Sequence, residues 1–198
     1  MILMMKTYFQ FWMRIISGSK KSILINVPKN LPVRPTTDKV KESLFNILEN
    51  RYDFDNCSVL DVFSGTGNLS YEFSSRGCLE IDSIDNNQLC INFINKRSNE
   101  LNLKIKGIKI DYKIFFKKNI KKYDIIFADP PYKFSYQEYI ELIKLIEENN
   151  ALKGEGTLII EHSSKIKLIK NNLEYEDRSY GSTSLTFIKK QAYKPDSV

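Results

Sequence analysis

Histidine occurs only once in this 198-residue sequence, and cysteine only three times. His162 follows the apolar run of an expected strand and no partner for a catalytic triad is evident, so we expect it to be structural. Cys57, Cys78 and Cys90 form an odd set without metal-ligand spacing. This pattern predicts reduced core thiols in a cytoplasmic protein, with no metal site.

The pattern of a secretion signal or a membrane anchor is also missing. The apolar segment 1–12 contains Lys6 and Gln10, and no small-residue cleavage pattern follows it. It is too short to span a bilayer. The run from Met13 to Ile16 resembles a more natural start, so we predict that 1–12 is a start-site extension and that the protein has no membrane partner.

Apolar residues are plentiful. A hydrophobic content of 42% with 12% aromatics predicts one medium-sized domain that folds alone, and we expect a monomer. The formal charge of +6 and the pI of about 9.0 are a modest basic excess that suggests a polyanionic partner without establishing one. Lysine pairs such as Lys117-Lys118 and Lys121-Lys122 are interpreted as solvated surface.

The N-terminal third is divided by turns and prolines. The segment "RIISGSKKSILINV" holds two β-prone runs around Ser17 to Lys20, which predicts a hairpin, and the linker "PKNLPVRP" follows it. From Thr36 or Thr37, either able to cap a helix, apolar positions recur at helical spacing. We predict a hairpin and linker over 13–35, the main domain over 36–190 and a tail over 191–198.

Within the main domain, apolar strands alternate with amphipathic helices. The expected strands are "CSVLDVF", "EIDSID", "KIKGIKI", "YDIIFA" and "GTLIIEH". Runs this apolar predict an α/β fold with a mainly parallel sheet covered by helices on both faces. The segments "LEYEDRSYG" and "STSLTFIKK" lie too close for a helical crossover, so they predict an antiparallel hairpin at the sheet edge.

Ligands of an open parallel sheet bind at the carboxyl ends of its strands. In "LDVFSGTGNLS", Asp61 lies near a strand end and a glycine turn over Gly65 to Gly67 follows. A dinucleotide loop would carry a third glycine where Ser70 stands, and Asp61 would repel a phosphate. The pattern favours a cationic, phosphate-free ligand such as S-adenosylmethionine (SAM); a tight turn without a ligand is the alternative.

Acidic residues also end the next two strands. Asp85 can accept both hydroxyls of a ribose, and Asp111 can accept from an adenine amine while the following backbone N–H donates to the ring. Three acids at successive strand ends fit one adenosyl ligand. The predicted cofactor-binding set is Asp61, Phe63, Gly65, Thr66, Gly67, Asp85, Asn86, Asp111 and Tyr112.

The stretch "ADPPY" ends the fourth strand with two residues that lack a backbone N–H. The resulting stiff turn offers only acceptors. The Asp129 side chain and the Pro130 carbonyl could accept both hydrogens of an exocyclic amine, exposing its lone pair to a methyl donor, while Tyr132 stacks on the ring. The predicted catalytic set is Asp129, Pro130, Pro131 and Tyr132.

At this point the sequence resembles class I SAM-dependent methyltransferases with a [DN]PP[YFW] motif. Within them it is similar to the RsmD-type family, the 16S rRNA guanine-N2 methyltransferases. The resemblance covers Met13 to about Lys189 and is carried by "MRIISG", "LPVRPTTDKVKESLFNIL", "VLDVFSGTGNLSYEFSSRG", "FADPPY" and "YGSTSLTF".

The resemblance implies a Rossmann-like, seven-stranded sheet and methyl transfer to the N2 amine of one guanine in 16S rRNA, as naked RNA or within a partly assembled 30S subunit. It also implies that Asp61 and the glycine loop border the methionine moiety, Asp85 the ribose and Asp111 the adenine. The basic N-terminal segment would contact RNA through Arg14, Lys20, Lys21 and Arg34. Two alternatives stay open: a DNA adenine-N6 or protein-glutamine methyltransferase, and a non-catalytic RNA-binding assembly factor.

Overall fold

The computed structural model describes residues 11–28, 31, 37–118, 121–168 and 175–190. The predictions made for the segment 1–10, for Arg34 and for the tail 191–198 lie outside these residues.

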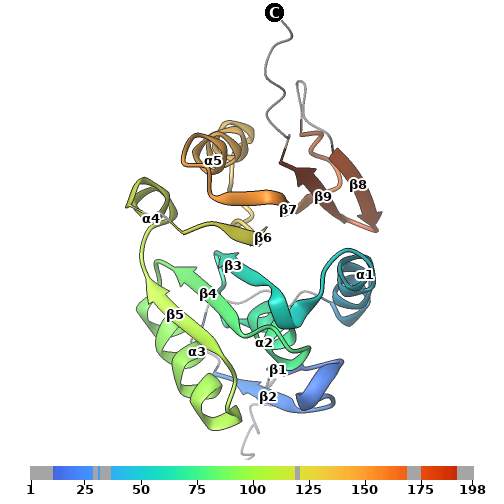
Figure 1. The fold of residues 1–198 in the computed structure, drawn as a ribbon, viewed down its shortest axis with the longest axis vertical. Coiled ribbons are helices and arrows are strands. Elements are labelled where there is room, and N and C mark those ends of the chain that lie inside the picture. The colour runs from blue at the N-terminus through green and yellow to red at the C-terminus, as the bar shows by residue number, and fades with distance from the viewer. Residues whose placement is uncertain (1–10, 29–30, 32–36, 119–120, 169–174, 191–198) are drawn as a thin grey trace, which may run out of the picture.

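A seven-stranded sheet of order β5-β4-β3-β6-β7-β9-β8 forms the body of the protein (Figure 1). Its strands are β3 (Ser58–Val62), β4 (Glu80–Asp85), β5 (Ile105–Lys109), β6 (Tyr123–Ala128), β7 (Leu152–Ser163), β8 (Tyr175–Tyr180) and β9 (Thr183–Lys189). The strands from β5 to β7 are parallel, whereas β9 is antiparallel to both β7 and β8. The predicted mainly parallel sheet and its antiparallel C-terminal hairpin are confirmed.

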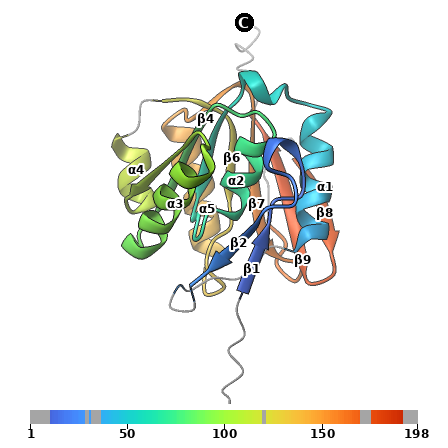
Figure 2. The same ribbon diagram turned by 90° about the horizontal axis from the view of Figure 1, so that it is seen from below.

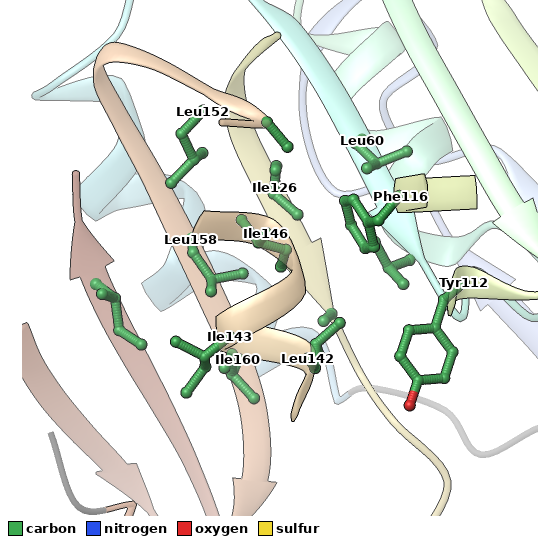
Figure 3. Close-up of a cluster of buried hydrophobic side chains, with 14 of the residues drawn as sticks. Leu60, Tyr112, Phe116, Ile126, Leu142, Ile143, Ile146, Leu152, Leu158 and Ile160 are labelled. Atoms are coloured by element: carbon green, nitrogen blue, oxygen red, sulfur yellow. The ribbon is translucent and has the colours of Figure 1, made fainter. Parts of the chain in front are cut away.

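Helices cover both faces of this sheet, as Figure 1 shows. One face carries α1 (Asp38–Glu49), α2 (Asn68–Ser75) and α3 (Gln88–Leu101), and the other carries α4 (Tyr112–Lys118) and α5 (Tyr136–Glu148). A short 3-10 turn, η2 (Phe54–Asn56), precedes β3. The apolar side chains of α5 pack on β6 and β7, with Tyr112 at the border of the same cluster (Figure 3).

Side-chain caps begin α1 and α5, and the cap of α1 is one of the two threonines expected from the sequence. Thr37 accepts from the amide of Val40 at 3.4 Å and so begins α1. Ser135 and Glu138 form a reciprocal capping box at the start of α5. Such caps satisfy the backbone amides that a first helical turn leaves without partners.

The strand expected to end at Asp111-Tyr112 is shorter than predicted. β5 ends at Lys109, and Tyr112 is the first residue of α4. Asp111 accepts from the amides of Lys113 at 2.9 Å and Ile114 at 3.4 Å. One oxygen of the Asp111 carboxylate therefore caps the N-terminus of α4. This cap was not predicted from the sequence, in which Asp111 was placed at a strand end.

The predicted N-terminal hairpin is also present. β1 (Phe11–Arg14) pairs antiparallel with β2 (Leu24–Val27), and the 3-10 turn η1 (Gly18–Lys20) lies between them. The hairpin begins at Phe11, before the expected boundary at residue 13. It packs outside α2 and α3 (Figure 2) through an apolar cluster that includes Met13, Tyr71 and Phe93.

The chain order places a topological switch point in the sheet. From β3 the chain moves outward to β4 and β5, and it then returns to β6 on the other side of β3. Val62 and Ala128, near the ends of β3 and β6, are register partners. Open α/β sheets bind ligands beside such a point, outside the carboxyl ends of the strands.

Candidate functional site

A cavity of about 520 Å³ lies at the carboxyl ends of β3, β4, β5 and β6. The predicted residues that line it are Asp61, Phe63, Gly65, Thr66, Asp85, Asn86, Asp111, Tyr112, Asp129, Pro130, Pro131 and Tyr132. Of the predicted cofactor and catalytic residues, Gly67 alone is not part of the lining. The proposed cofactor side and the proposed amine side therefore share one space.

The two glycines of the loop after β3 have different roles. Gly65 has φ of +51° and donates its amide to Asp85 Oδ2 at 2.9 Å. Gly67 has φ of +81°, and a Cβ there would lie 2.9 Å from the Ile94 side chain. Gly67 thus permits the turn and the close packing of α2 on α3, whereas Gly65 connects the loop to β4.

Backbone amides on two sides orient the carboxylate of Asp85. Oδ2 accepts from Gly65 at 2.9 Å, and Oδ1 accepts from Asn87 at 2.7 Å. Asn87 is also the N-cap of α3 and accepts from Leu89 at 2.9 Å. Each carboxylate oxygen has further lone-pair capacity, so Asp85 is held in place and can still accept from a ligand.

Asp61 is the buried acid of the cavity, with 3% of its surface exposed. Burial raises its pKa from 3.8 to about 7, and the carboxylates of Asp129 and Asp85 add to the increase. The Ser70 hydroxyl donates to Asp61 Oδ2 at 2.5 Å, which opposes the increase. A cation entering the cavity would favour the ionised form of Asp61.

An aromatic cluster forms another part of the wall. The ring centroids of Phe63 lie 5.0 Å from Tyr112 and 5.5 Å from Phe134. Phe63 has φ of +61°, a strained conformation for a bulky residue that is common at binding sites. The buried Tyr112 hydroxyl has no hydrogen-bond partner within the described part of the chain, and Figure 3 shows it pointing away from the core cluster.

The turn after β6 has the exposure pattern that base stacking would require. Asp129 is half-buried and Pro130 is buried, whereas Tyr132 is 74% exposed. The amide of Phe134 donates to the Pro131 carbonyl at 2.8 Å, which closes the turn. The turn is thus closed while most of Tyr132 remains accessible.

Of the predicted RNA-contacting residues that the structure describes, Arg14 contacts a different helix from Lys20. Arg14 donates to Asp38 Oδ2 at 2.6 Å at the start of α1. The amide of Lys20 donates at 2.9 Å to Ser75, the last residue of α2, and Lys21 follows it. Since α2 begins at the cavity with Asn68, Lys20 and Lys21 lie beside the end of α2 that is remote from the cavity.

Other lining residues were not identified in the sequence. They are Ser64, Asn68, Leu69, Asn87, Cys90, Phe127, Lys133, Phe134 and Glu138. Most of them flank a predicted motif by one or two positions, and this adjacency is the signal that could have identified them. Cys90 and Glu138 lie farther from any motif, on α3 and α5, and only the folded structure brings them to the cavity.

The remaining polar candidates have structural environments. Cys57, Cys78 and Cys90 are buried free thiols, and burial raises their pKa values to about 12, 11 and 11. His162 is buried, with Nε2 2.8 Å from Thr186 Oγ1. In the described ranges, we find no metal-ligand cluster and no helix that could cross a membrane.

The fold defined by this sheet and cavity is that of the class I, Rossmann-like methyltransferases. The solved structure of the Escherichia coli protein yhhF has the same fold, with a TM-score of 0.80 at 24% identity over 92% of this chain and 99% of that chain. The Haemophilus influenzae protein HI0767 superposes with a TM-score of 0.73 at 26% identity, covering 90% of this chain and 98% of that one.

Residues 13–189 match the model of the family described as "Conserved hypothetical protein 95", and the chain belongs to this family. The ribosomal RNA small subunit methyltransferase D of Haemophilus influenzae is 35% identical over 162 residues, which cover 79% of this chain and 81% of the relative. The Bacillus subtilis protein YlbH is 33% identical over 187 residues, covering 90% of this chain and all of the relative. The family resemblance read from the motifs is confirmed.

Proposed function

We propose that this protein transfers a methyl group from SAM to the exocyclic N2 amine of a guanine in small-subunit rRNA. The observation that carries the proposal is the shared cavity of Asp61, Asp85 and the turn over Asp129 to Tyr132. An acceptor array for an amine beside acids suited to an adenosyl ligand is what such a transfer requires.

The cavity residues fit SAM in three respects. Asp85 is oriented by two backbone amides and can accept from ribose hydroxyls. Asp61 favours a cationic group, such as the amino-acid end or the sulfonium. Tyr112 lines the same cavity after Asp111, so its ring and backbone N–H could meet the adenine. When bound, SAM supplies the electrophilic methyl group.

Asp129 and Pro130 would prepare the amine for attack. An exocyclic amine on a purine is a weak nucleophile because its lone pair is delocalised into the ring. The Asp129 carboxylate and the Pro130 carbonyl would accept its two hydrogens, which favours a pyramidal nitrogen with its lone pair exposed. The exposed ring of Tyr132 would stack on the base.

The choice of RNA as the substrate rests on the relatives and on charge. The Haemophilus influenzae relative is named for small-subunit ribosomal RNA, and the net charge of +6 suits a polyanion. We propose that Arg14, Lys20, Lys21 and Arg34 contribute to RNA binding. The protein would act as a cytoplasmic monomer on 16S rRNA, either naked or within a partly assembled 30S subunit.

Transfer of labelled methyl groups from SAM tests the proposal directly. The acceptors are 16S rRNA, 30S particles, duplex DNA and protein, each prepared from a strain that lacks this gene. We expect label in the small-subunit RNA alone. Label in DNA or in protein glutamine would support the other amine-directed methyltransferases, and RNA binding without turnover would support an assembly factor.

A further inference from the structure

Lys41 occupies an unusual place for a lysine, because its side chain is only 1% exposed. It lies on α1, and its Nζ donates to the Arg14 carbonyl at 2.5 Å and to Asn68 Oδ1 at 3.1 Å. The two acceptors belong to different elements, namely the last residue of β1 and the first residue of α2. One buried ammonium therefore joins the N-terminal hairpin to the helix that follows the glycine loop.

Two carboxylates give this ammonium its counter-charge: Asp38, whose Oδ1 lies 3.7 Å from Lys41 Nζ at the start of α1, and the more deeply buried Glu72. The Glu72 side chain is fully buried, and its Oε2 lies 3.9 Å from Lys41 Nζ. Glu72 also accepts from the amides of Ile16 at 2.9 Å and Ser17 at 3.0 Å. A buried ion pair is tolerated when further hydrogen bonds satisfy its members. Here those bonds come from the hairpin backbone and from Arg76, whose Nε donates to Glu72 Oε1 at 2.9 Å.

A second contact joins the hairpin to the glycine loop directly. The hydroxyl of Thr66, inside the loop, donates to Met13 Sδ on β1 at 3.1 Å. Thr66 and Asn68 both line the cavity and flank Gly67. The hairpin therefore contacts Thr66 directly and is connected to Asn68, on the other side of the second glycine, through Lys41.

We propose that Lys41 is a positioning residue that couples the N-terminal hairpin to the cofactor side of the cavity. Lys41 holds the Asn68 side chain in the cavity wall and fixes the end of β1 beside it, so that the hairpin becomes part of the cofactor-binding unit. The inference rests on the proposed SAM site for its functional consequence. Cofactor binding would stabilise the hairpin, and a well-docked hairpin would strengthen cofactor binding by the same factor.

Amide hydrogen exchange and calorimetry on Lys41→Met, Asn68→Ala and the control Lys39→Met test this coupling. Lys39 lies on the same helix but is exposed. In the parent and the control, saturating SAM should slow exchange of the Ile16 and Ser17 amides. In the Lys41 and Asn68 variants this slowing should disappear, and SAM should bind roughly 5- to 150-fold more weakly.

The outcomes separate coupling from a merely structural role. SAM affinity within twofold of the parent in folded variants, or hairpin exchange that does not respond to SAM in the parent, would overturn the proposal. If Lys41→Met does not fold, Asn68→Ala decides the question, because it leaves the Lys41 and Glu72 pair intact.

Hydrogen exchange measured without SAM tests the role of Lys41 independently of the proposed function. The Gly67 amide donates to the Ser64 carbonyl at 2.7 Å within the loop. Lys41→Met should accelerate exchange of the Gly67 amide, whereas Lys39→Met should not. If the parent fails to bind SAM, the cofactor assignment fails, and unchanged Gly67 exchange would then also remove the positioning role of Lys41.

Discussion

The amide of Gly65 donates a 2.9 Å hydrogen bond to Oδ2 of Asp85. This bond joins the loop after β3 to the end of β4, and it aims an acidic side chain at the cavity between them. The glycine turn and the acid at the next strand end thus form one structure, in which each fixes the position of the other.

Asp85→Ala should weaken SAM binding by roughly 1.5–3 kcal/mol, because it removes charge-assisted hydrogen bonds to the ribose. It also takes away the acceptor of the Gly65 amide. Titration calorimetry measures the change, and a thermal unfolding curve shows whether the variant is folded. Unchanged affinity in a folded variant would remove Asp85 from the site.

Asp129→Ala should separate chemistry from cofactor binding. Asp129 is assigned to the incoming amine, so SAM affinity should remain near that of the parent while methyl transfer falls by orders of magnitude. Single-turnover measurements with excess enzyme report the chemical step. A near-normal rate in this variant would contradict the proposed amine activation.

SAM affinity should increase as the pH rises through about 7. Burial raises the pKa of Asp61 to about 7, so the protein without cofactor keeps this proton up to that pH. A bound cation favours the ionised carboxylate, and binding must therefore release the proton when the pH is lower. Below the pKa, affinity should fall by up to about tenfold per pH unit.

Asp61→Asn is the matched control for this pH dependence, since it keeps the side-chain volume and cannot ionise. Its SAM affinity should be lower at pH 8 and nearly constant between pH 5.5 and 8.5, when measured by calorimetry. A parent whose affinity does not change over the same range would exclude Asp61 as the group that meets the cation.

The raised pKa of Asp61 also affects the free energy of unfolding of the protein without cofactor. An unfolded Asp61 would release its proton near its ordinary pKa of 3.8, whereas the folded protein holds the proton to about 7. The free energy of unfolding should therefore decline as the pH rises from about 4 to 7. Asp61→Asn should lose this part of the decline in denaturant titrations, and parallel curves for the two proteins would contradict the shifted pKa.

Neutralising Arg14, Lys20, Lys21 and Arg34 should weaken RNA binding and leave SAM affinity intact. For each bond to an RNA phosphate that the substitutions remove, the slope of log affinity against log salt should flatten by roughly 0.7–0.9. Filter binding over a salt series measures the slope. The control is the double variant Lys117→Ala and Lys118→Ala, at the end of α4, whose lysines are also exposed.

The position of Lys20 and Lys21 makes this test sharper. They lie beside the end of α2 that is remote from the cavity. An RNA that contacts these lysines and also enters the cavity must therefore extend along the hairpin. If the quadruple variant keeps the parent's salt slope and the Lys117 and Lys118 variant does not, RNA docking would be assigned to the lysine-rich end of α4 instead.

The apolar strands were the part of the fold that could be predicted best. β4 and β6 coincide with "EIDSID" and "YDIIFA". β6 has the continuous apolar run that is typical of a buried parallel strand, whereas β4 has two isoleucines among polar residues. The shared cavity of Asp61, Asp85 and Asp129 could also be predicted, because the carboxyl ends of parallel strands meet at one edge of the sheet.

Features that depend on tertiary contacts could not be predicted. Asp111 caps α4, and an acid that caps a helix looks the same in sequence as one that faces a ligand. The docking of the hairpin depends on Glu72, a buried acid in α2 whose partners include the distant amides of Ile16 and Ser17. No local pattern marks such an acid, because its role is set by a segment more than fifty residues away.

Nucleoside mass spectrometry of 16S rRNA tests the central claim most directly. The RNA comes from a strain lacking this gene, complemented either with the parent or with Asp129→Ala, and the two proteins are expressed at matched levels. We expect one additional N2-methylguanosine in the parent-complemented strain and its loss with Asp129→Ala. Equal N2-methylguanosine content in the deletion strain and in the parent-complemented strain would contradict it.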